Sequence, residues 1–256
     1  MREKPWEGYI KPSKMIGNLY FAGTYDASTH IIDTGEGLIL IDPGYSESLH
    51  MVINNIWELG FKPTDIKYIV ISHAHYDHMD ATEALVAMSG AKTFIGREDL
   101  PLLEGEIYHY PIKTFKPDVL LDDGDVISLG NTKIECVHTP GHTDGTFSFF
   151  FDVCEGTEIY RAGMFGGAGT NTMVKNFLEK NNLPPDNRQR FIDSIKRLMR
   201  EKVDVFVGNH VWNNKTDKKL AELEGSEKNP FINTEEWNTF LKERMSRINS
   251  VIKNDE

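Results

Sequence analysis

The sequence predicts an α/β fold in which two packed β-sheets carry helices on their outer faces. Two observations predict it. Short apolar runs of strand-like composition outnumber the helical segments, and a series of strands closed by a helix occurs twice along the chain. No linker rich in proline, glycine or serine separates independent units, so we expect a single domain over residues 1–256.

The first half of the chain contains short strands and two helices. Glycines and a Pro-Gly pair separate the strands, whereas apolar residues at helical spacing followed by Gly60 mark the first helix. The expected strands cover residues 19–22, 30–32, 38–42, 69–71 and 92–95, and the expected helices cover about 46–59 and 81–88.

The second half repeats this order with longer elements. The helix expected to start near residue 187 has Asp186 as its N-cap, and Thr234 caps the last helix. Two long loops are expected at 97–118 and 163–185. Each could be a lid or a surface excursion, and the sequence does not decide between these two interpretations. The expected strands cover residues 126–129, 133–137, 146–152, 158–162 and 203–207, and the helices cover about 187–202 and 235–253.

Composition limits the class of partner. A hydrophobic fraction of 39% is enough for a sizeable core, and a formal net charge of −11 argues against nucleic acid. No run approaches the roughly 18 apolar residues of a membrane span, and residues 1–10 lack a secretory apolar segment. If the sequence is complete, we expect a cytoplasmic protein. We expect it to act on a small-molecule substrate and to have no membrane partner, and a homo-oligomer is possible.

The two cysteines indicate no sulfur chemistry. Cys136 and Cys154 stand in no CxxC or CxxH pattern, so we expect neither a thiolate metal site nor a disulfide framework. Cys136 lies in an alternating run and is interpreted as a buried apolar residue.

The segment Ile69–His78 holds the strongest chemical signal. An apolar β-branched run ends in three histidines and one aspartate within six residues: His73, His75, Asp77 and His78. Imidazole nitrogens and carboxylate oxygens are the usual non-sulfur ligands of zinc. Alternation at a strand end turns His73 and His75 to one side, and Asp77 and His78 follow in the turn. This arrangement suits two adjacent metal ions.

Three further segments place polar residues directly after strands. They are His138–Thr143, Gly208–His210 and Ala162–Gly167. Loops held by a rigid scaffold commonly carry active-site residues. We therefore expect these segments to meet the histidine cluster.

Together these motifs resemble the metallo-β-lactamase superfamily over residues 16–252. The run His73–His78 is similar to its HxHxDH hallmark, His142 to its third histidine, and His210 to its last. The resemblance implies an αββα sandwich with two mixed sheets and outer helices. It also implies two Zn²⁺ ions per chain, with iron or manganese as alternatives. It assigns His73, His75 and His142 to metal one, and Asp77, His78 and His210 to metal two.

One position departs from the common pattern of that superfamily. Gly163-Met164 stands where most members have Gly-Asp, and a methionine thioether cannot bridge two metals as a carboxylate does. The third subclass of metallo-β-lactamases also lacks the bridging aspartate. Asn229–Ile232 and Asp118–Ile127 resemble that subclass as well.

The resemblance implies a metallo-hydrolase in which hydroxide shared between the metals attacks an amide or ester carbonyl. Asp77 is the expected catalytic residue, and a β-lactam or a similar cyclic compound is the expected substrate. Ser72 or Thr143 is expected to hydrogen-bond ligand imidazoles, whereas His138 bonds backbone.

Four residues are candidates for contact with substrate: Met164, Trp212, Tyr76 and His109. Trp212 packed under the second loop is an equally good interpretation. Other functions also fit the pattern: a lactonase or thioesterase of the same fold, an iron-dependent oxidoreductase, or a non-catalytic metal-binding protein.

Overall fold

Two mixed β-sheets form the centre of the computed structural model, which describes residues 3–105, 114–184 and 186–255. In the first sheet the early strands pair antiparallel, and the strands from β4 onward pair parallel. In spatial order its strands are β1 (Ser13–Ile16), β2 (Leu19–Phe21), β3 (His30–Asp33), β4 (Leu38–Ile41), β5 (Ile66–Val70), β6 (Lys92–Gly96) and β7 (Val119–Leu121).

The second sheet is antiparallel except at one edge, where β11 and β12 pair parallel. In spatial order its strands are β12 (Val205–Phe206), β11 (Glu158–Met164), β10 (Phe147–Glu155), β9 (Thr132–His138) and β8 (Val126–Leu129). The α-helices are α1 (Leu49–Glu58), α2 (Tyr76–Met79), α3 (Thr82–Ser89), α4 (Leu100–Leu103), α5 (Lys175–Lys180), α6 (Asn187–Leu198), α7 (Val211–Asn214), α8 (Thr216–Glu222) and α9 (Glu236–Asp255).

Strand alternation divides the apolar residues into three layers. Ile39 and Ile41 of β4 pack with Phe149 and Phe151 of β10 between the two sheets. Leu40 instead joins Val52 and Ile56 of α1 on the outer face of the first sheet. Phe150 of β10 packs with Phe191 of α6 and Trp237 of α9 on the opposite outer face.

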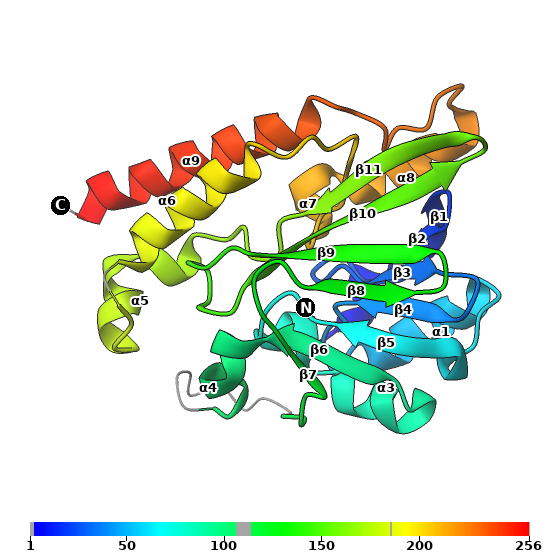
Figure 1. Ribbon diagram of the computed structural model, residues 1–256, viewed down its shortest axis with the longest axis horizontal. Coiled ribbons are helices and arrows are strands. Elements are labelled where there is room, and N and C mark those ends of the chain that lie inside the picture. Colours follow the sequence, from blue (N-terminus) through cyan, green and yellow to red (C-terminus); the bar gives the residue numbers. More distant parts are fainter. Residues whose placement is uncertain (1–2, 106–113, 185, 256) are drawn as a thin grey trace.

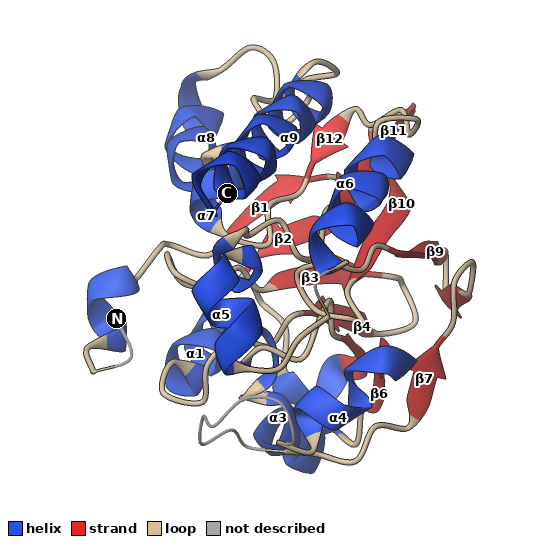
Figure 2. Ribbon diagram, turned by 90° about the vertical axis from the view of Figure 1, so that its left-hand side faces the viewer, coloured by secondary structure: helices blue, strands red, loops and turns tan. Residues whose placement is uncertain are grey.

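These layers confirm the αββα sandwich expected from the sequence. In Figure 1, α6 and α9 lie to the upper left of the strands, and α1 and α3 lie at the lower right. Figure 2 shows the same separation after a quarter turn. β4 is buried at every position, which explains why it reads as a continuous apolar run, whereas Lys67 of β5 is exposed.

Most expected elements are confirmed, with ends that differ by a few residues. The loop 163–185 was expected to be irregular but contains α5, and the loop 97–118 contains α4. The short edge strands β1 and β7 and the helices α7 and α8 were not expected. Asp186 stands at the N-cap of α6, yet its side chain makes no capping hydrogen bond.

Cys136 is buried, which confirms one smaller expectation, and Cys154 is exposed; both are free thiols. Within the described ranges, no helix combines the length and the apolar character that a membrane crossing requires.

Candidate metal centre and its cavity

Six predicted ligands converge where segments of the two sheets meet. His73, His75 and His142 form a first ligand group, and Asp77, His78 and His210 form a second. In each group the ligand atoms lie within 4.8 Å of one another. The ring centroids of His73 and His78 are 4.2 Å apart, so the two groups are direct neighbours.

Asp42, at the end of β4, organises the segment that follows β5. Its backbone has a φ of 54°, a left-handed conformation that is uncommon outside glycine. Its carboxylate accepts hydrogen bonds from the Ser72 backbone and hydroxyl, both at 2.7 Å, and from His78 Nδ1 at 2.8 Å. Because Asp42 is completely buried, these three bonds replace the water that its charge would otherwise bind. The strained backbone therefore serves to aim this carboxylate.

Ser72 connects the Asp42 carboxylate to His73 through two hydrogen bonds. The Ser72 hydroxyl has a single proton, which it donates to Asp42. The His73 Nδ1–H therefore donates to Ser72 Oγ at 3.0 Å, which leaves Nε2 as an unprotonated donor atom for a metal. The expectation that Ser72 contacts a ligand imidazole is confirmed.

Asp99 connects the histidine loop to the loop that carries His142. Its carboxylate accepts the Ala74 and Gly145 backbone N–H groups at 2.7 Å and the Thr143 hydroxyl at 2.9 Å. Thr143 thus contacts Asp99 and Thr146, so the expectation that it contacts an imidazole is wrong. Burial raises the pKa of Asp99 to about 6 despite these three hydrogen bonds.

The loop between β9 and β10 depends on Gly141. Its φ is +134°, and a Cβ added there would come within 2.7 Å of the Phe191 backbone in α6. Only glycine permits both the conformation and this approach. The adjacent His138 donates to the Asp144 carbonyl at 2.7 Å, which confirms its expected backbone role.

Backbone carbonyls fix the remaining histidines. The ring Nδ1–H of His142 donates to the Gly169 carbonyl at 3.0 Å, and that of His210 donates to the Asp26 carbonyl at 2.6 Å. A carbonyl can only accept, so Nε2 of each neutral ring carries a lone pair. Sequence reasoning missed Asp26 and Gly169, because a carbonyl contact from a distant loop leaves no residue-type signal.

The electrostatic environment keeps most of these imidazoles neutral. Desolvation by burial lowers the pKa values of His73, His142 and His210, and it lowers that of His75 to about 4. Burial acts the same way on His78, but the carboxylates of Asp77 and Asp42 outweigh it and raise its pKa to about 10.

Asp77 stays ionised at neutral pH. Burial opposes this, but the nearby His78 and His210 rings lower the pKa of its carboxyl. Its Oδ2 lies 3.4 Å from His78 Nε2 and 3.8 Å from His210 Nε2. The Asp77 carboxylate oxygen and the Nε2 atoms of His78 and His210 therefore lie close enough together to bind one cation.

The donor sets fit zinc. Three imidazoles form the first group, and two imidazoles with one carboxylate form the second, which are typical zinc ligands. His78 Nε2 is buried and makes no hydrogen bond within the described part of the chain, as expected of an atom kept for a cation. Asp42 supplies the carboxylate behind a ligating imidazole that such sites commonly have.

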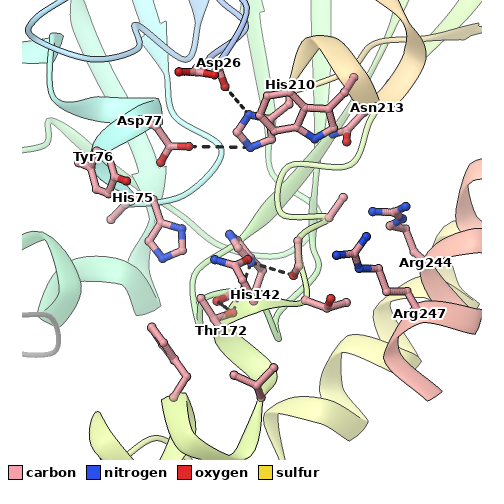
Figure 3. Close-up of a pocket in the computed structure, with 18 of the residues that line it drawn as sticks. Asp26, His75, Tyr76, Asp77, His142, Thr172, His210, Asn213, Arg244 and Arg247 are labelled. Atoms are coloured by element: carbon pink, nitrogen blue, oxygen red, sulfur yellow. Dashed lines mark hydrogen bonds and ion pairs between the residues drawn. The ribbon is translucent and has the colours of Figure 1, made fainter. Parts of the chain in front are cut away.

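A cavity of about 620 Å³ opens over two members of each ligand group, His75 and His142 of the first and Asp77 and His210 of the second. Tyr76 and Trp212 lie in its wall, and Figure 3 shows Tyr76 beside Asp77. The Trp212 ring stacks on His210 with centroids 4.4 Å apart and planes 8° apart. Trp212 is 51% exposed, so the alternative in which it packs under the second loop is wrong.

The other two candidates for substrate contact have different outcomes. Met164 is completely buried in the core between the sheets and is not part of the cavity wall. It cannot contact a substrate in the cavity, because its position on β11 turns the side chain inward. His109 lies outside the described residues.

Comparison with known proteins agrees with this architecture. The profile described as Metallo-beta-lactamase superfamily matches residues 22–155, slightly more than half of the chain. The probable polyketide biosynthesis zinc-dependent hydrolase PksB of Bacillus subtilis is 27% identical over 49% of this chain and 51% of its own length. A hydroxyacylglutathione hydrolase of Maricaulis maris is 31% identical over 47% of this chain and 40% of its own.

A solved structure matches over nearly its whole length. BJP-1, a subclass B3 metallo-β-lactamase of Bradyrhizobium japonicum, is 27% identical, with a TM-score of 0.88 over 100% of this chain and 98% of its own. This match confirms the resemblance to the third subclass, whereas the matches to the two curated relatives span about half of each or less. By its family profile, its sandwich and its ligand pattern, the chain belongs to the metallo-β-lactamase superfamily.

Proposed function

We propose that this protein is a zinc-dependent hydrolase of an amide or ester carbonyl, with a β-lactam or a similar strained cyclic compound as substrate. One observation carries the proposal. Two complete ligand groups lie side by side at a cavity large enough for a small organic molecule. The likeness to BJP-1 over almost the entire chain supports the β-lactam in particular.

The first ligand group would hold one zinc ion and the second group another. Bound zinc supplies a Lewis acid and lowers the pKa of a coordinated water from 15.7 to about 7, so that hydroxide is available at neutral pH. The chain itself keeps His73, His142 and His210 neutral and fixes their inward nitrogens through Ser72, Gly169 and Asp26.

Asp77 has two tasks in this proposal. Its carboxylate borders the cavity and is ionised, so one oxygen can accept a hydrogen bond from the attacking water and orient it. The same oxygen can take the proton and pass it to the leaving nitrogen or oxygen. Tyr76 and Trp212 provide aromatic walls that hold the rest of the substrate and limit the access of water.

A screen with zinc-loaded protein tests the proposal. Nitrocefin, a lactone, a thioester and a phosphodiester are offered to the wild type and to His73→Ala, which loses one ligand of the first group. We expect hydrolysis of nitrocefin by the wild type alone. Equal rates for the two proteins, or no hydrolysis of any substrate, would refute the proposal.

A thioesterase is the second candidate, favoured by the similarity to the hydroxyacylglutathione hydrolase. Met164 counts against a thioesterase, because thioesterases of this fold normally keep the bridging aspartate at that position. The thioester arm of the screen separates the two candidates. Metal analysis of protein purified without added metal covers the remaining alternative, since stoichiometric iron with oxygen uptake would indicate an oxidoreductase.

A further inference from the structure

The C-terminal helix contributes two arginines to the cavity. Arg244, Arg247 and Val251 of α9 all line it, and their spacing of three and four residues places them on one face of the helix. Figure 3 shows both guanidinium groups extending from α9, on the side of the cavity away from His75 and Tyr76. A substrate that fills the cavity therefore meets a basic wall opposite these residues.

Among the arginines of the described residues, only these two and the exposed Arg200 have no carboxylate partner. Elsewhere in the described part of the chain, five arginines pair with a carboxylate: Arg97 with Asp122, Arg161 with Glu135, Arg188 with Asp255, Arg190 with Asp144 and Arg197 with Asp123. Over the same residues, no carboxylate lies within 4 Å of Arg244 or Arg247. In a protein of net charge −11, carboxylates are abundant, so two neighbouring cations without one are informative.

The environment of Arg244 makes its charge costly. The side chain is half-buried and its guanidinium carbon lies 4.9 Å from the centre of the Phe240 ring. Its Nε is buried and has no hydrogen-bond partner among the described residues. Desolvation lowers the pKa of Arg244 and repulsion from Arg247 lowers it further, which together outweigh the attraction of Glu243. An anion between the two guanidinium groups would relieve both effects.

We propose that Arg244 and Arg247 form a binding site for an oxyanion, a carboxylate or a phosphate, carried at the end of the substrate remote from the bond that is hydrolysed. A planar guanidinium offers paired N–H donors that match the two oxygens of such a group. This inference rests on the proposed function for the placement of the carbonyl, and it extends that function from a reaction type to a class of acidic substrates.

Matched esters test the inference in zinc-loaded protein. Mono-p-nitrophenyl adipate ends in a carboxylate where p-nitrophenyl hexanoate ends in a methyl group. We expect the wild type to prefer the adipate ester roughly tenfold or more in kcat/KM, the size of one charge-assisted hydrogen bond. Arg244→Gln and Arg247→Gln should lose most of this preference while keeping the rate for hexanoate, and Arg244→Lys should keep part of it.

Arg200→Gln is the matched control, because Arg200 is exposed, stands outside the cavity wall and has no ion pair among the described residues. A preference that survives in the Arg244→Gln/Arg247→Gln double variant would overturn the inference. Since Arg247 is exposed, its single variant remains informative even if Arg244→Gln folds poorly.

Binding measurements separate this inference from the proposed function. Glutarate, inorganic phosphate and neutral glutaramide are titrated by calorimetry into metal-free and zinc-loaded protein. We expect binding of glutarate or phosphate, but not of glutaramide, to weaken roughly tenfold in both arginine variants with or without zinc. The stronger of the two anions identifies the oxyanion. If neither ester were hydrolysed but this arginine-dependent binding persisted, the proposed function would fail and the anion site would stand; equal binding by wild type and variants would refute the site.

Discussion

At the scale of single residues, the centre is arranged by the partners of the outward-facing ring nitrogens. Ser72, Asp42, the Gly169 carbonyl and the Asp26 carbonyl each accept a hydrogen bond from one imidazole. Each of these contacts fixes one ring nitrogen as N–H and leaves the other free to bind metal. Two groups of potential metal ligands are therefore already arranged in the protein alone.

Asp77→Asn tests the role of the ionised carboxylate. The amide keeps the shape of the side chain but cannot accept a proton, and it removes the charge that balances a metal in the second group. We expect turnover to fall by roughly 10²-fold or more while KM changes far less. Steady-state kinetics on the best substrate of the screen give both constants. Wild-type turnover in this variant would contradict the role given to Asp77.

Buried His30 makes the free energy of unfolding depend on pH, and a single substitution can separate this contribution from those of other groups. Its Nε2–H donates to the Gly208 carbonyl at 3.0 Å, while its buried Nδ1 has no partner among the described residues. Burial lowers its pKa from 6.5 to about 4, so the unfolded chain takes up this proton first as the pH falls. The stabilising contribution of neutral His30 is thus complete above pH 6.5 and is lost as the pH falls to about 4.

His30→Gln keeps a donor towards Gly208 but cannot titrate. We expect the free energy of unfolding of the wild type to fall by about 3 kcal/mol more than that of the variant between pH 7 and pH 4. Urea unfolding in the presence of EDTA measures this without a contribution from metal. Parallel pH profiles for the two proteins would show that His30 does not titrate in this window.

Which residues converge could be predicted from the sequence, because His73, His75, Asp77 and His78 stand within six positions and the family resemblance added His142 and His210. Asp42 and Asp99 could not be recognised in the same way. Their carboxylates act through backbone N–H groups and hydroxyls of distant loops, and no residue type at the receiving end marks the contact. Thr143 was given the wrong partner for this reason.

At the scale of elements, strands with an apolar core were predicted more accurately than the short elements at the edges. β4 is a continuous apolar run, whereas β7 has three residues and β12 only two. Their extended conformation comes from pairing with a neighbour, which local composition does not reveal. Likewise α5 lies in a segment expected to be irregular, and it folds against partners elsewhere in the chain.

Asp99→Ala tests how the elements of the centre are held together. The change leaves the buried N–H groups of Ala74 and Gly145 without an acceptor, and each lost partner costs about 1–3 kcal/mol. Removal of a buried charge offsets part of this cost. We therefore expect a net loss of about 2 kcal/mol and weaker retention of zinc, because the two loops also carry His73, His75 and His142.

Urea unfolding and chelator competition give the two readouts. Asp152→Ala, on exposed sheet surface, is the matched control and should behave as the wild type. If Asp99→Ala unfolded at the wild-type urea concentration, the link that we assign to Asp99 would be absent.

At the scale of the whole molecule, each ligand group joins the two sheets. His73 and His75 follow β5 of the first sheet, and His142 belongs to the β9–β10 loop of the second. Asp77 and His78 also follow β5, while His210 comes directly after β12 of the second sheet. Opening the sandwich therefore separates the ligands of both groups, so metal binding and stability of the fold are linked.

This linkage predicts how zinc affects unfolding. A ligand that binds only the folded protein stabilises it by about 2.7 kcal/mol for each site at one hundred times its dissociation constant. We expect zinc to raise Tm in two steps as its concentration increases. His73→Ala and His210→Ala should each bind one zinc ion per chain instead of two, because each lacks a ligand of a different group.

The second group should be the weaker, because two of its three members, Asp77 and His210, are only half-buried and no carboxylate stands at position 164. Differential scanning fluorimetry against buffered zinc, together with metal analysis after dialysis, distinguishes the two variants. His73→Ala should lose the step at low zinc, and His210→Ala the step at high zinc. Two zinc ions retained by either variant, or a Tm that does not respond to zinc, would show that the groups do not act as two cross-sheet metal sites.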